Sequence, residues 1–356
     1  MSRHAHGDAL LVDSLTRATP VSCGQQRRGK QMMKIRVAAI ALAALIAGVT
    51  IGAAQDYPSR PITMIVPFAA GGPTDALARV LGDRMRQALG ETFVVENVTG
   101  AGGTIGVARA VRAAPDGYTL SVGHLGTHVI NGAMYTLPFD LINDLDPVAL
   151  VASNPMMIVS KNDVPAKNLK ELIAWIKANE GKVTAGTAGV GSGAHFSGIF
   201  FEQLIGTHLQ FVPYRGTGPA LLDLVAGQID IIVDQASNSL PQVQAGKIRA
   251  YAITDKKRLA AAPDVPTVAE AGLPALQIEL WSGIWVPKGT PKDIVAKLNG
   301  AIVEALADPA VKKRFAEVGL DVPPVAQQKP EALAAHQQAE VKKWWPMIKA
   351  ANVKAN

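Results

Sequence analysis

The sequence predicts an α/β fold of two domains, each with a mostly parallel sheet flanked by helices, and three observations support this fold class. Apolar runs of strand length alternate with amphipathic segments of helix length along most of the chain. Glycine-rich loops join a strand to a helix in both halves, at 68–75 and at 187–195. The 356 residues are enough for two domains with separate cores.

The predicted first domain starts with a buried strand at 62–66, which is rich in β-branched residues. A helix follows, because Leu77, Leu81 and Met85 are spaced to share one helical face. Short connections between alternating strands and helices favour parallel strands with helices on both faces. The other elements predicted here are strands at 92–96 and 118–122 and a helix around 107–111.

Two apolar stretches predict where the chain crosses between the domains: 145–160 leads into the second domain and 281–286 leads back. We therefore assign residues 55–156 and 284–356 to domain 1 and residues 157–283 to domain 2. Within domain 2, Asn168 is placed to cap a helix and Gly227 to end one. The elements predicted there are helices at 169–179, 194–205 and 219–226 and strands at 183–187, 209–212, 229–233 and 248–254.

Three helices are predicted after the return crossing, at 293–307, 309–318 and 330–348. The last of them carries Trp344 and Trp345. Large aromatic side chains bury much apolar area, so we expect both tryptophans to hold this helix against domain 1.

Residues 32–54 have the pattern of a signal peptide. Lys34 and Arg36 precede an apolar run at 37–51, and small residues follow it up to Ala54. The run is shorter than the roughly 20 residues that a membrane-spanning helix needs. We predict cleavage after Ala54 and export to the periplasm. Residues 1–31 fit no part of such a peptide and are interpreted as a non-native or misassigned N-terminal extension, with translation starting at Met32 or Met33.

The net charge of +6 does not indicate a nucleic-acid partner, because most of it lies in residues 1–54, ahead of the predicted mature chain. Residues 1–54 hold seven basic and two acidic side chains, which leaves 28 basic and 27 acidic side chains in the rest. A nearly neutral body with few aromatic residues is not typical of a nucleic-acid surface. The one cysteine, Cys23, lies in the extension, so we expect no disulfide in the mature chain.

A dinucleotide-binding enzyme is one alternative. Gly189, Gly191 and Ala194 fit the relaxed spacing of the dinucleotide fingerprint, after a strand and before a helix. However, the next strand ends in Pro213 and Tyr214 rather than in an acidic residue for a ribose.

Hydrolytic and metal sites are further alternatives. Ser192 and His195 are three residues apart at a helix start, where a serine more often caps than attacks. His124 and His128 are four apart, but no nearby Cys, Asp or Glu completes a metal site. We therefore predict no catalytic residues, no metal and no cofactor.

The strand-to-helix loops are better suited to an anion. A strand that ends at a helix start directs backbone N–H groups and the positive helix end into one place, which suits a carboxylate. The loop at 68–75 has this design, and the loop at 187–195 repeats it. Arg215 adds a cation in a third loop, and Asp234 ends an apolar strand. Asp234 either accepts hydrogen bonds from a ligand or caps the next helix.

Nine short segments follow one another in a recognisable order: YPSRPI at 57–62, VPFAAGGPTD at 66–75, GAGG at 100–103, PDGY at 115–118, GSGAH at 191–195, VPYRG at 212–216, GQID at 227–230, VPTVAEAG at 265–272 and PKGTP at 287–291. In this order they resemble the receptors of tripartite tricarboxylate transporters, also called Bug receptors. The resemblance covers essentially the whole mature chain. It departs at Ala70, where the family commonly has proline, and at His124, Leu125 and Gly126, where small hydroxyl residues are frequent.

The resemblance implies a monomeric two-domain periplasmic binding protein of the type II-like flytrap kind, joined by crossover strands. It would close on a small organic carboxylate and pass it to the permease subunits of the transporter. The ligand-binding residues that it implies come from loops of both domains: Phe68, Ala69, Ala70, Gly71, Gly72, Thr74, Asp75, His124, Thr127, Asn131, Thr187, Gly191, Ser192, His195, Arg215, Gly216, Thr217 and Asp234.

Overall fold

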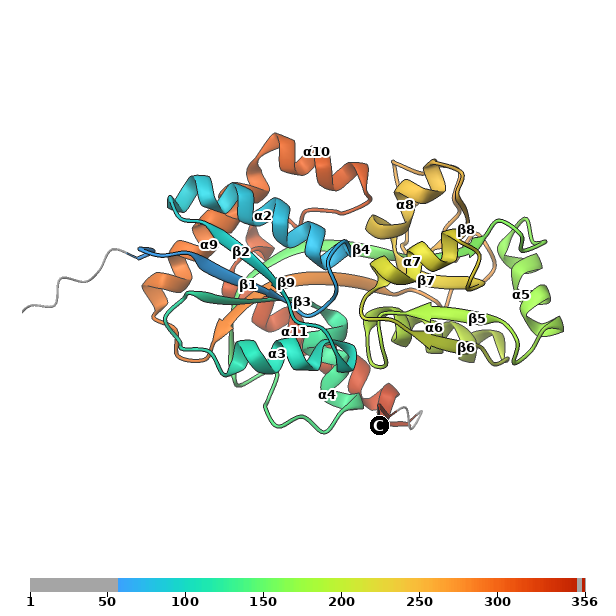
Figure 1. Ribbon diagram of the computed structural model, residues 1–356, viewed down its shortest axis with the longest axis horizontal. Helices are drawn as coiled ribbons and strands as arrows, with labels where there is room; N and C mark the ends of the chain where they lie inside the picture. Colours follow the sequence, from blue (N-terminus) through green and yellow to red (C-terminus); the bar gives the residue numbers. More distant parts are fainter. Residues whose placement is uncertain (1–56, 351–353, 356) are drawn as a thin grey trace, which may run out of the picture. The chain divides into compact units, whose positions relative to one another are not determined.

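The computed structural model describes residues 57–350 and 354–355, so the predicted extension and signal peptide lie outside the described residues (Figure 1). No helix in this part is both long and apolar enough to cross a membrane. The strands are β1 (Ile62–Val66), β2 (Phe93–Asn97), β3 (Thr119–His124), β4 (Leu145–Lys161), β5 (Thr184–Thr187), β6 (Gln210–Pro213), β7 (Ile231–Gln235), β8 (Ile248–Ile253) and β9 (Glu279–Pro287).

The described strands form one mixed sheet in the order β2-β1-β3-β9-β4-β7-β5-β6, with β8 paired to β4. Strand β1 pairs in parallel with β2 and β3, and β5 pairs in parallel with β6 and β7. The antiparallel pairs are β3–β9, β4–β9, β4–β7 and β4–β8. Each half is therefore parallel except where it meets the long strands β4 and β9, in agreement with the predicted fold class.

Strands β4 and β9 connect the two halves, as the two apolar stretches predicted. The first part of β4 pairs with β9 from Leu145 to Pro155, and the rest pairs with β7 and β8 from Met156 to Lys161. Figure 1 shows both strands running between the group around β1–β3 and the group around β5–β8. Most of β4 is buried, which agrees with its mainly apolar sequence.

The main helices are α2 (Pro73–Leu89), α3 (Thr104–Val111), α4 (Asn131–Met134), α5 (Leu169–Ala178), α6 (Gly193–Ile205), α7 (Thr217–Val225), α8 (Ala236–Gln244), α9 (Lys292–Ala307), α10 (Pro309–Glu317) and α11 (Pro330–Ala350). Short turns of 3₁₀- or π-helix occur at Ala101–Gly103, Gly126–Ile130 and Val325–Gln327. We call β1–β3 with α2–α4 and α9–α11 lobe 1, and β5–β8 with α5–α8 lobe 2.

The local signals for helix ends are confirmed. The Asn168 side chain accepts a hydrogen bond from the backbone N–H of Glu171 at 2.9 Å, and Gly227 takes a left-handed φ of 76° after α7. Leu77, Leu81 and Met85 of α2 are all buried in the core of lobe 1. The bounds of helix α8, the helix expected after Asp234, were not predicted, because Pro241 and five polar residues obscure its periodicity.

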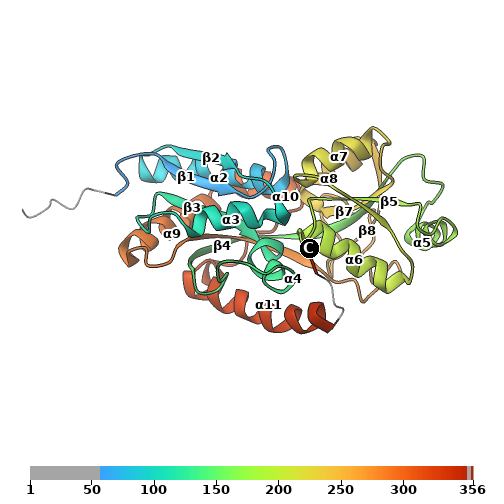
Figure 2. The same ribbon diagram turned by 60° about the horizontal axis from the view of Figure 1, so that its bottom comes forward.

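The two tryptophans of α11 contact different lobes. Trp345 Nε1 donates to the Val129 carbonyl at 2.9 Å, which confirms a contact with lobe 1. The Trp344 ring instead packs edge-on against Phe196 and Phe200 of α6, with centroids 5.0 and 6.3 Å apart. The expectation that both tryptophans face the first domain is therefore wrong for Trp344. Figure 2 shows the C-terminal end of α11 beside α6.

Candidate functional site

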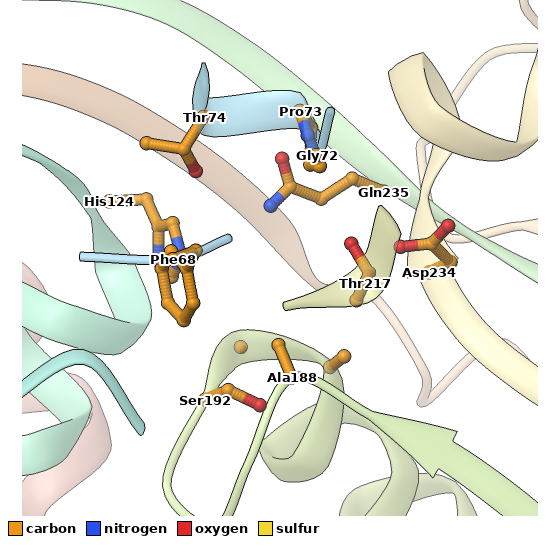
Figure 3. A pocket seen from close by; sticks show the side chains of 12 residues that line it. Phe68, Gly72, Pro73, Thr74, His124, Ala188, Ser192, Thr217, Asp234 and Gln235 are labelled. Carbon is orange, nitrogen blue, oxygen red and sulfur yellow. The ribbon is translucent and has the colours of Figure 1, made fainter. Parts of the chain in front are cut away.

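A pocket lies where loops of the two lobes meet (Figure 3). Its cavity volume is about 20 Å³, within about 330 Å³ of empty space that includes the solvent at its mouth. The lining residues are Phe68, Gly72, Pro73, Thr74 and His124 from lobe 1, and Ala188, Ser192, Gly193, Ala194, Thr217, Asp234 and Gln235 from lobe 2.

Four helices begin at this pocket: α2 at Pro73, α6 at Gly193, α7 at Thr217 and α8 at Ala236. The first N–H groups of a helix have no partner within it, and the helix dipole adds a partial positive charge there. The pocket therefore favours an anion. No lysine or arginine is among its lining residues in the described part of the chain, so backbone groups supply this preference.

Ser192 acts as the N-cap of α6. Its Oγ accepts a hydrogen bond from the His195 backbone N–H at 3.2 Å. His195 Nδ1 in turn accepts from the Gly191 N–H at 3.2 Å, and burial lowers the His195 pKa to about 4. The pair is thus occupied in shaping the loop, and the capping interpretation of Ser192 is confirmed.

His124 presents a neutral hydrogen-bond donor. Burial lowers its pKa to about 4, so the ring is uncharged near neutral pH. Its Nδ1 accepts a hydrogen bond from the Gly126 N–H at 3.0 Å, which leaves the proton on Nε2. Among the described residues none accepts a hydrogen bond from Nε2, and the ring lines the pocket stacked against Phe68.

Asp234 is the buried acid of the pocket. Its Oδ2 accepts hydrogen bonds from Asn238 Nδ2 at 2.6 Å and from Ser239 Oγ at 2.7 Å, whereas Oδ1 has no partner within the described chain. Burial raises the pKa of Asp234 to about 6, although Ser239, Asn238, the Thr217 side chain and the Gln235 backbone N–H act in the opposite direction. The N-cap of α8 is Gln235, so Asp234 is not the cap of that helix.

Asp75 holds the loop of lobe 1 in place from outside the pocket. Its carboxylate accepts hydrogen bonds from the Gly71 N–H at 3.0 Å, from Arg79 at 2.9 Å and from Asn97 at 3.0 Å. Burial acts to raise the pKa of Asp75, but these hydrogen bonds outweigh it and lower the pKa. Asn97 also donates to the Phe68 carbonyl at 2.9 Å, so Asp75 is tied to the strand end that carries the ring.

Glycines allow the loops of the two lobes to touch through their backbones. A Cβ atom on Gly102 would lie 2.2 Å from the Val190 carbonyl oxygen, and one on Gly126 would lie 2.7 Å from the Gly193 nitrogen. A hydrogen bond from the Ala69 N–H to the Arg215 carbonyl, 2.8 Å long, joins the lobes nearby. Gly102 and Gly126 of lobe 1 thus allow the backbone to approach the glycine-rich loop at 187–195 of lobe 2.

The structure brings seven of the predicted residues to the pocket: Phe68, Gly72, Thr74, His124, Ser192, Thr217 and Asp234. The others lie in or next to the same loops but do not line the pocket: Ala69, Ala70, Gly71, Asp75, Thr127, Asn131, Thr187, Gly191, His195, Arg215 and Gly216. Sequence reasoning missed Pro73, Ala188, Gly193, Ala194 and Gln235. Strand β7 runs two residues beyond its predicted end, and its last residue, Gln235, is polar and therefore lay outside the apolar run.

Several of these neighbouring residues support the loops. The Thr127 hydroxyl accepts from the His124 N–H at 3.1 Å, and Asn131 donates to the Gly102 carbonyl at 3.0 Å. The Thr187 hydroxyl accepts from the Gly189 N–H at 3.3 Å. Arg215 has an exposed side chain, and its link to lobe 1 is made by its backbone carbonyl.

His128 lies apart from the pocket. Its ring stacks on Trp285 with centroids 3.8 Å apart, and its nitrogens lie 2.9 Å from the Thr127 hydroxyl and 3.2 Å from that of Ser121. Burial lowers the pKa of His128 to about 3. Within the described residues no group of three or more His, Cys, Asp or Glu side chains is arranged to hold a metal ion.

Residues 77–353 match the family model described as the tripartite tricarboxylate transporter family receptor. A protein of Agrobacterium vitis, named as the UPF0065 protein in the TAR-I ttuE-ttuC' intergenic region, is 40% identical over 345 residues, which are 96% of this chain and 99% of that protein. Both similarities span the two lobes.

Solved structures agree with the family match. The periplasmic binding protein BugD is 41% identical with a TM-score of 0.81, covering 84% of this chain and 100% of its own. MatC from Rhodopseudomonas palustris, solved with bound malate, is 40% identical with a TM-score of 0.80, covering 82% and 100%. Rpa4515 from R. palustris, solved with adipate, is 31% identical with a TM-score of 0.79, covering 83% and 99%. The chain therefore belongs to the tripartite tricarboxylate transporter receptor family, whose members are solute-binding receptors and not enzymes.

Proposed function

We propose that this protein is a periplasmic solute-binding protein that captures a small organic carboxylate between its two lobes, for uptake by a tripartite tricarboxylate-type transporter. The main support is the pocket at which four helices begin, because their free N–H groups and the positive ends of their dipoles favour a carboxylate. His124 adds a neutral N–H donor on the lobe 1 side.

The ligands of similar proteins support a carboxylate. MatC was solved with malate and Rpa4515 with adipate, and both ligands are small dicarboxylates. Backbone donors recognise the carboxylate group and are indifferent to most of the carbon chain that carries it. The side chains of the lining residues would then distinguish one acid from another.

Closure of the lobes is the proposed mechanism of capture. The hydrogen bond from the Ala69 N–H to the Arg215 carbonyl and that from the Tyr135 hydroxyl to the Val190 carbonyl both join the lobes. Such contacts exist only when the lobes meet, so a ligand that bridges them shifts the equilibrium towards the closed form. Strands β4 and β9 would act as the hinge between domain 1 (55–156 and 284–356) and domain 2 (157–283).

The delivery system is part of the same proposal. Export by the predicted signal peptide at 32–54, with cleavage after Ala54, would place a monomeric receptor in the periplasm. The closed form would present the surface that the permease subunits recognise. Uptake of a radiolabelled ligand into cells with and without the permease genes tests this partnership.

Thermal melting of the purified protein tests carboxylate binding. Malate, succinate, adipate, citrate, acidic amino acids and NAD are added separately, and hits are titrated by calorimetry. We expect at least one carboxylate to raise the melting temperature and to bind with one-to-one stoichiometry, because a ligand that binds only the folded state stabilises it. Stabilisation by NAD alone, without a response to any carboxylate, would contradict the proposal.

A further inference from the structure

The pocket has an uneven distribution of donors and acceptors. Its two titratable lining residues are His124 on lobe 1 and Asp234 on lobe 2. His124 is neutral and offers an N–H, whereas Asp234 is a carboxyl group whose neighbours in the pocket, Thr217 and Gln235, are uncharged. Within the described chain no lysine or arginine lines the pocket to offset the Asp234 charge. A bare carboxylate placed beside ionised Asp234 would be repelled.

One oxygen of Asp234 lacks a donor. Oδ2 is fixed by Asn238 and Ser239, but Oδ1 is buried and makes no hydrogen bond of good geometry in the described chain. The Thr217 hydroxyl and the Gln235 N–H lie near enough to the carboxyl to lower its pKa, but neither is aligned to donate to Oδ1. Figure 3 shows one carboxyl oxygen of Asp234 directed towards Thr217 at the pocket. Leaving a buried carboxylate oxygen without a donor is costly, more so than for a neutral group. A donor on a ligand in the pocket would complete the hydrogen bonding of Oδ1.

We propose that Asp234 selects a carboxylate ligand that carries a hydrogen-bond donor, a hydroxyl or an ammonium group, on the carbon next to the carboxylate. The helix N-termini and His124 Nε2–H bind the carboxylate, and Asp234 Oδ1 accepts the hydrogen bond from the adjacent donor. This inference rests on the proposed function and narrows its ligand class to hydroxy acids and amino acids.

Acids without such a donor are the competitors that Asp234 would reject. Succinate and glutarate offer only acceptors, so Oδ1 would stay unpartnered and would face added negative charge. A site built to hydrogen-bond a ligand group discriminates strongly against the analogue that lacks it. Malate, the ligand of MatC, carries a hydroxyl of the required kind.

Calorimetric titration with two matched series tests the inference. The four-carbon series is succinate, malate and aspartate, and the five-carbon series is glutarate, 2-hydroxyglutarate and glutamate. We expect at least about tenfold tighter binding of the hydroxy or amino acid than of the plain acid in the series that binds. The comparison of malate with aspartate shows whether the donor is a hydroxyl or an ammonium.

Asp234→Asn sharpens the test, because Asn238 and Ser239 both donate to Oδ2. In the variant, Asn238 and Ser239 favour the oxygen of the new side-chain amide at the Oδ2 position. The NH₂ group of that amide then lies at the Oδ1 position, in the pocket. The variant therefore replaces an acceptor by a donor of the same size. We expect its preference for the donor-bearing acid to be lost or reversed, with succinate or glutarate binding more tightly than to the wild type.

Asp230→Asn is the matched control. Asp230 lies just before β7, at the end of that strand opposite Asp234, and pairs with Lys161 at 2.7 Å outside the pocket. We expect its preference ratio to equal that of the wild type. The inference would be overturned, and the proposed function kept, by either of two results. One is equal affinity of the wild type for plain and donor-bearing acids, and the other is an unchanged ratio of these affinities in Asp234→Asn. Failure to bind any acid would overturn the proposed function and the inference with it. The wild-type series decides the question even where a variant does not fold.

Discussion

The phenyl ring of Phe68 lies parallel to the imidazole of His124, with ring centroids 5.3 Å apart and 7° between the planes. Phe68 follows β1 and His124 ends β3, so the pairing of these neighbouring strands brings the two rings together. The stack fixes the imidazole, and the Gly126 N–H bond to Nδ1 sets its tautomer. A rigid, uncharged donor thus faces the pocket from lobe 1.

His124→Phe should keep an aromatic ring against Phe68 and remove the Nε2–H donor. A hydrogen bond to a charged group contributes about 1.5–3 kcal/mol, so the affinity for the carboxylate that binds best should fall by at least about tenfold. Calorimetric titration measures the change. His128→Phe is the control, because His128 stacks on Trp285 away from the pocket. Equal losses of affinity in the two variants would count against a direct role of His124.

The stability of the ligand-free protein should fall in mild acid. Burial lowers the pKa of His124 and His195 to about 4 and that of His128 to about 3. Below pH 6.5 these histidines bind protons in the unfolded chain but stay neutral in the folded protein. Each therefore lowers the free energy of unfolding by roughly 1.4 kcal/mol per pH unit, down to its folded pKa.

Asp234 acts in the opposite direction in the same range. Its folded pKa of about 6 lies above its ordinary value of 3.8, so the folded protein binds this proton more tightly and gains stability as the pH falls from 6 to 4. Because Asp234 offsets one of the three histidines, the free energy of unfolding should fall by roughly 3 kcal/mol per pH unit below pH 6. Urea unfolding at pH 7, 6 and 5 measures it. A flat profile over this range would show that these histidines are not buried.

Asp234→Asn should stabilise the ligand-free protein at pH 7 and have little effect at pH 4. The carboxyl is destabilising when it is ionised and buried, and the shift of its pKa from 3.8 to about 6 corresponds to up to about 3 kcal/mol. The difference in unfolding free energy between variant and wild type at the two pH values measures this. The same variant loses the ligand preference described above, so stability and specificity should change in opposite directions.

Gly218→Ala should weaken ligand binding without destabilising the fold. Gly218 lies in α7, where alanine is the better helix former by up to about 1 kcal/mol. Its Cβ, however, would lie 3.1 Å from backbone atoms of Gly71 and Gly72 in the opposite lobe, which must then move. We expect a severalfold loss of affinity with an unchanged or higher melting temperature.

Gly300→Ala in α9 is the matched control for Gly218→Ala. A Cβ at Gly300 has no atom within 4 Å, so this variant should gain stability and keep its affinity. If both glycine variants bind the ligand as the wild type does, close approach of the backbones at Gly218 does not limit closure.

Asp75→Ala should destabilise the protein by about 1–2 kcal/mol, because the Gly71 N–H and Asn97 lose their buried acceptor. The Arg79 side chain is half exposed, so the ion pair itself adds little. Binding should weaken through the Phe68 loop, since Asp75 does not line the pocket. Asp83→Ala, on the exposed face of the same helix, should leave both stability and affinity unchanged. Chemical unfolding and calorimetry measure the two effects.

The order of strands and helices could be read from the chain because its signals are local. The apolar runs of β1 and β4, the cap at Asn168 and the helix end at Gly227 each depend on a few neighbouring residues. The same holds for the strand-to-helix loops, whose backbone donors made an anion site predictable. The bounds of helix α8 were not predicted for the same reason, since Pro241 and its polar residues weaken the local pattern.

The roles of single side chains depended on contacts between distant segments. Asp75 and Asp234 both lie at a strand-to-helix junction, but their roles differ. Asp75 accepts a hydrogen bond from Asn97 of β2 and supports a loop. Asp234 is buried, and its Oδ1 makes no hydrogen bond of good geometry in the described chain. Trp344 and Trp345 are adjacent, yet they contact different lobes.

The sequence by itself determined the α/β pattern, the two crossings and the loops that form the pocket, because periodicity and turn chemistry act within a few residues. The tertiary structure alone decided which residues of those loops reach the pocket and which glycines let the lobes meet. Which residues line the pocket, and which glycines lie at contacts between lobes, depends on strands and loops that are far apart in the chain. No pattern within a few neighbouring residues can predict this.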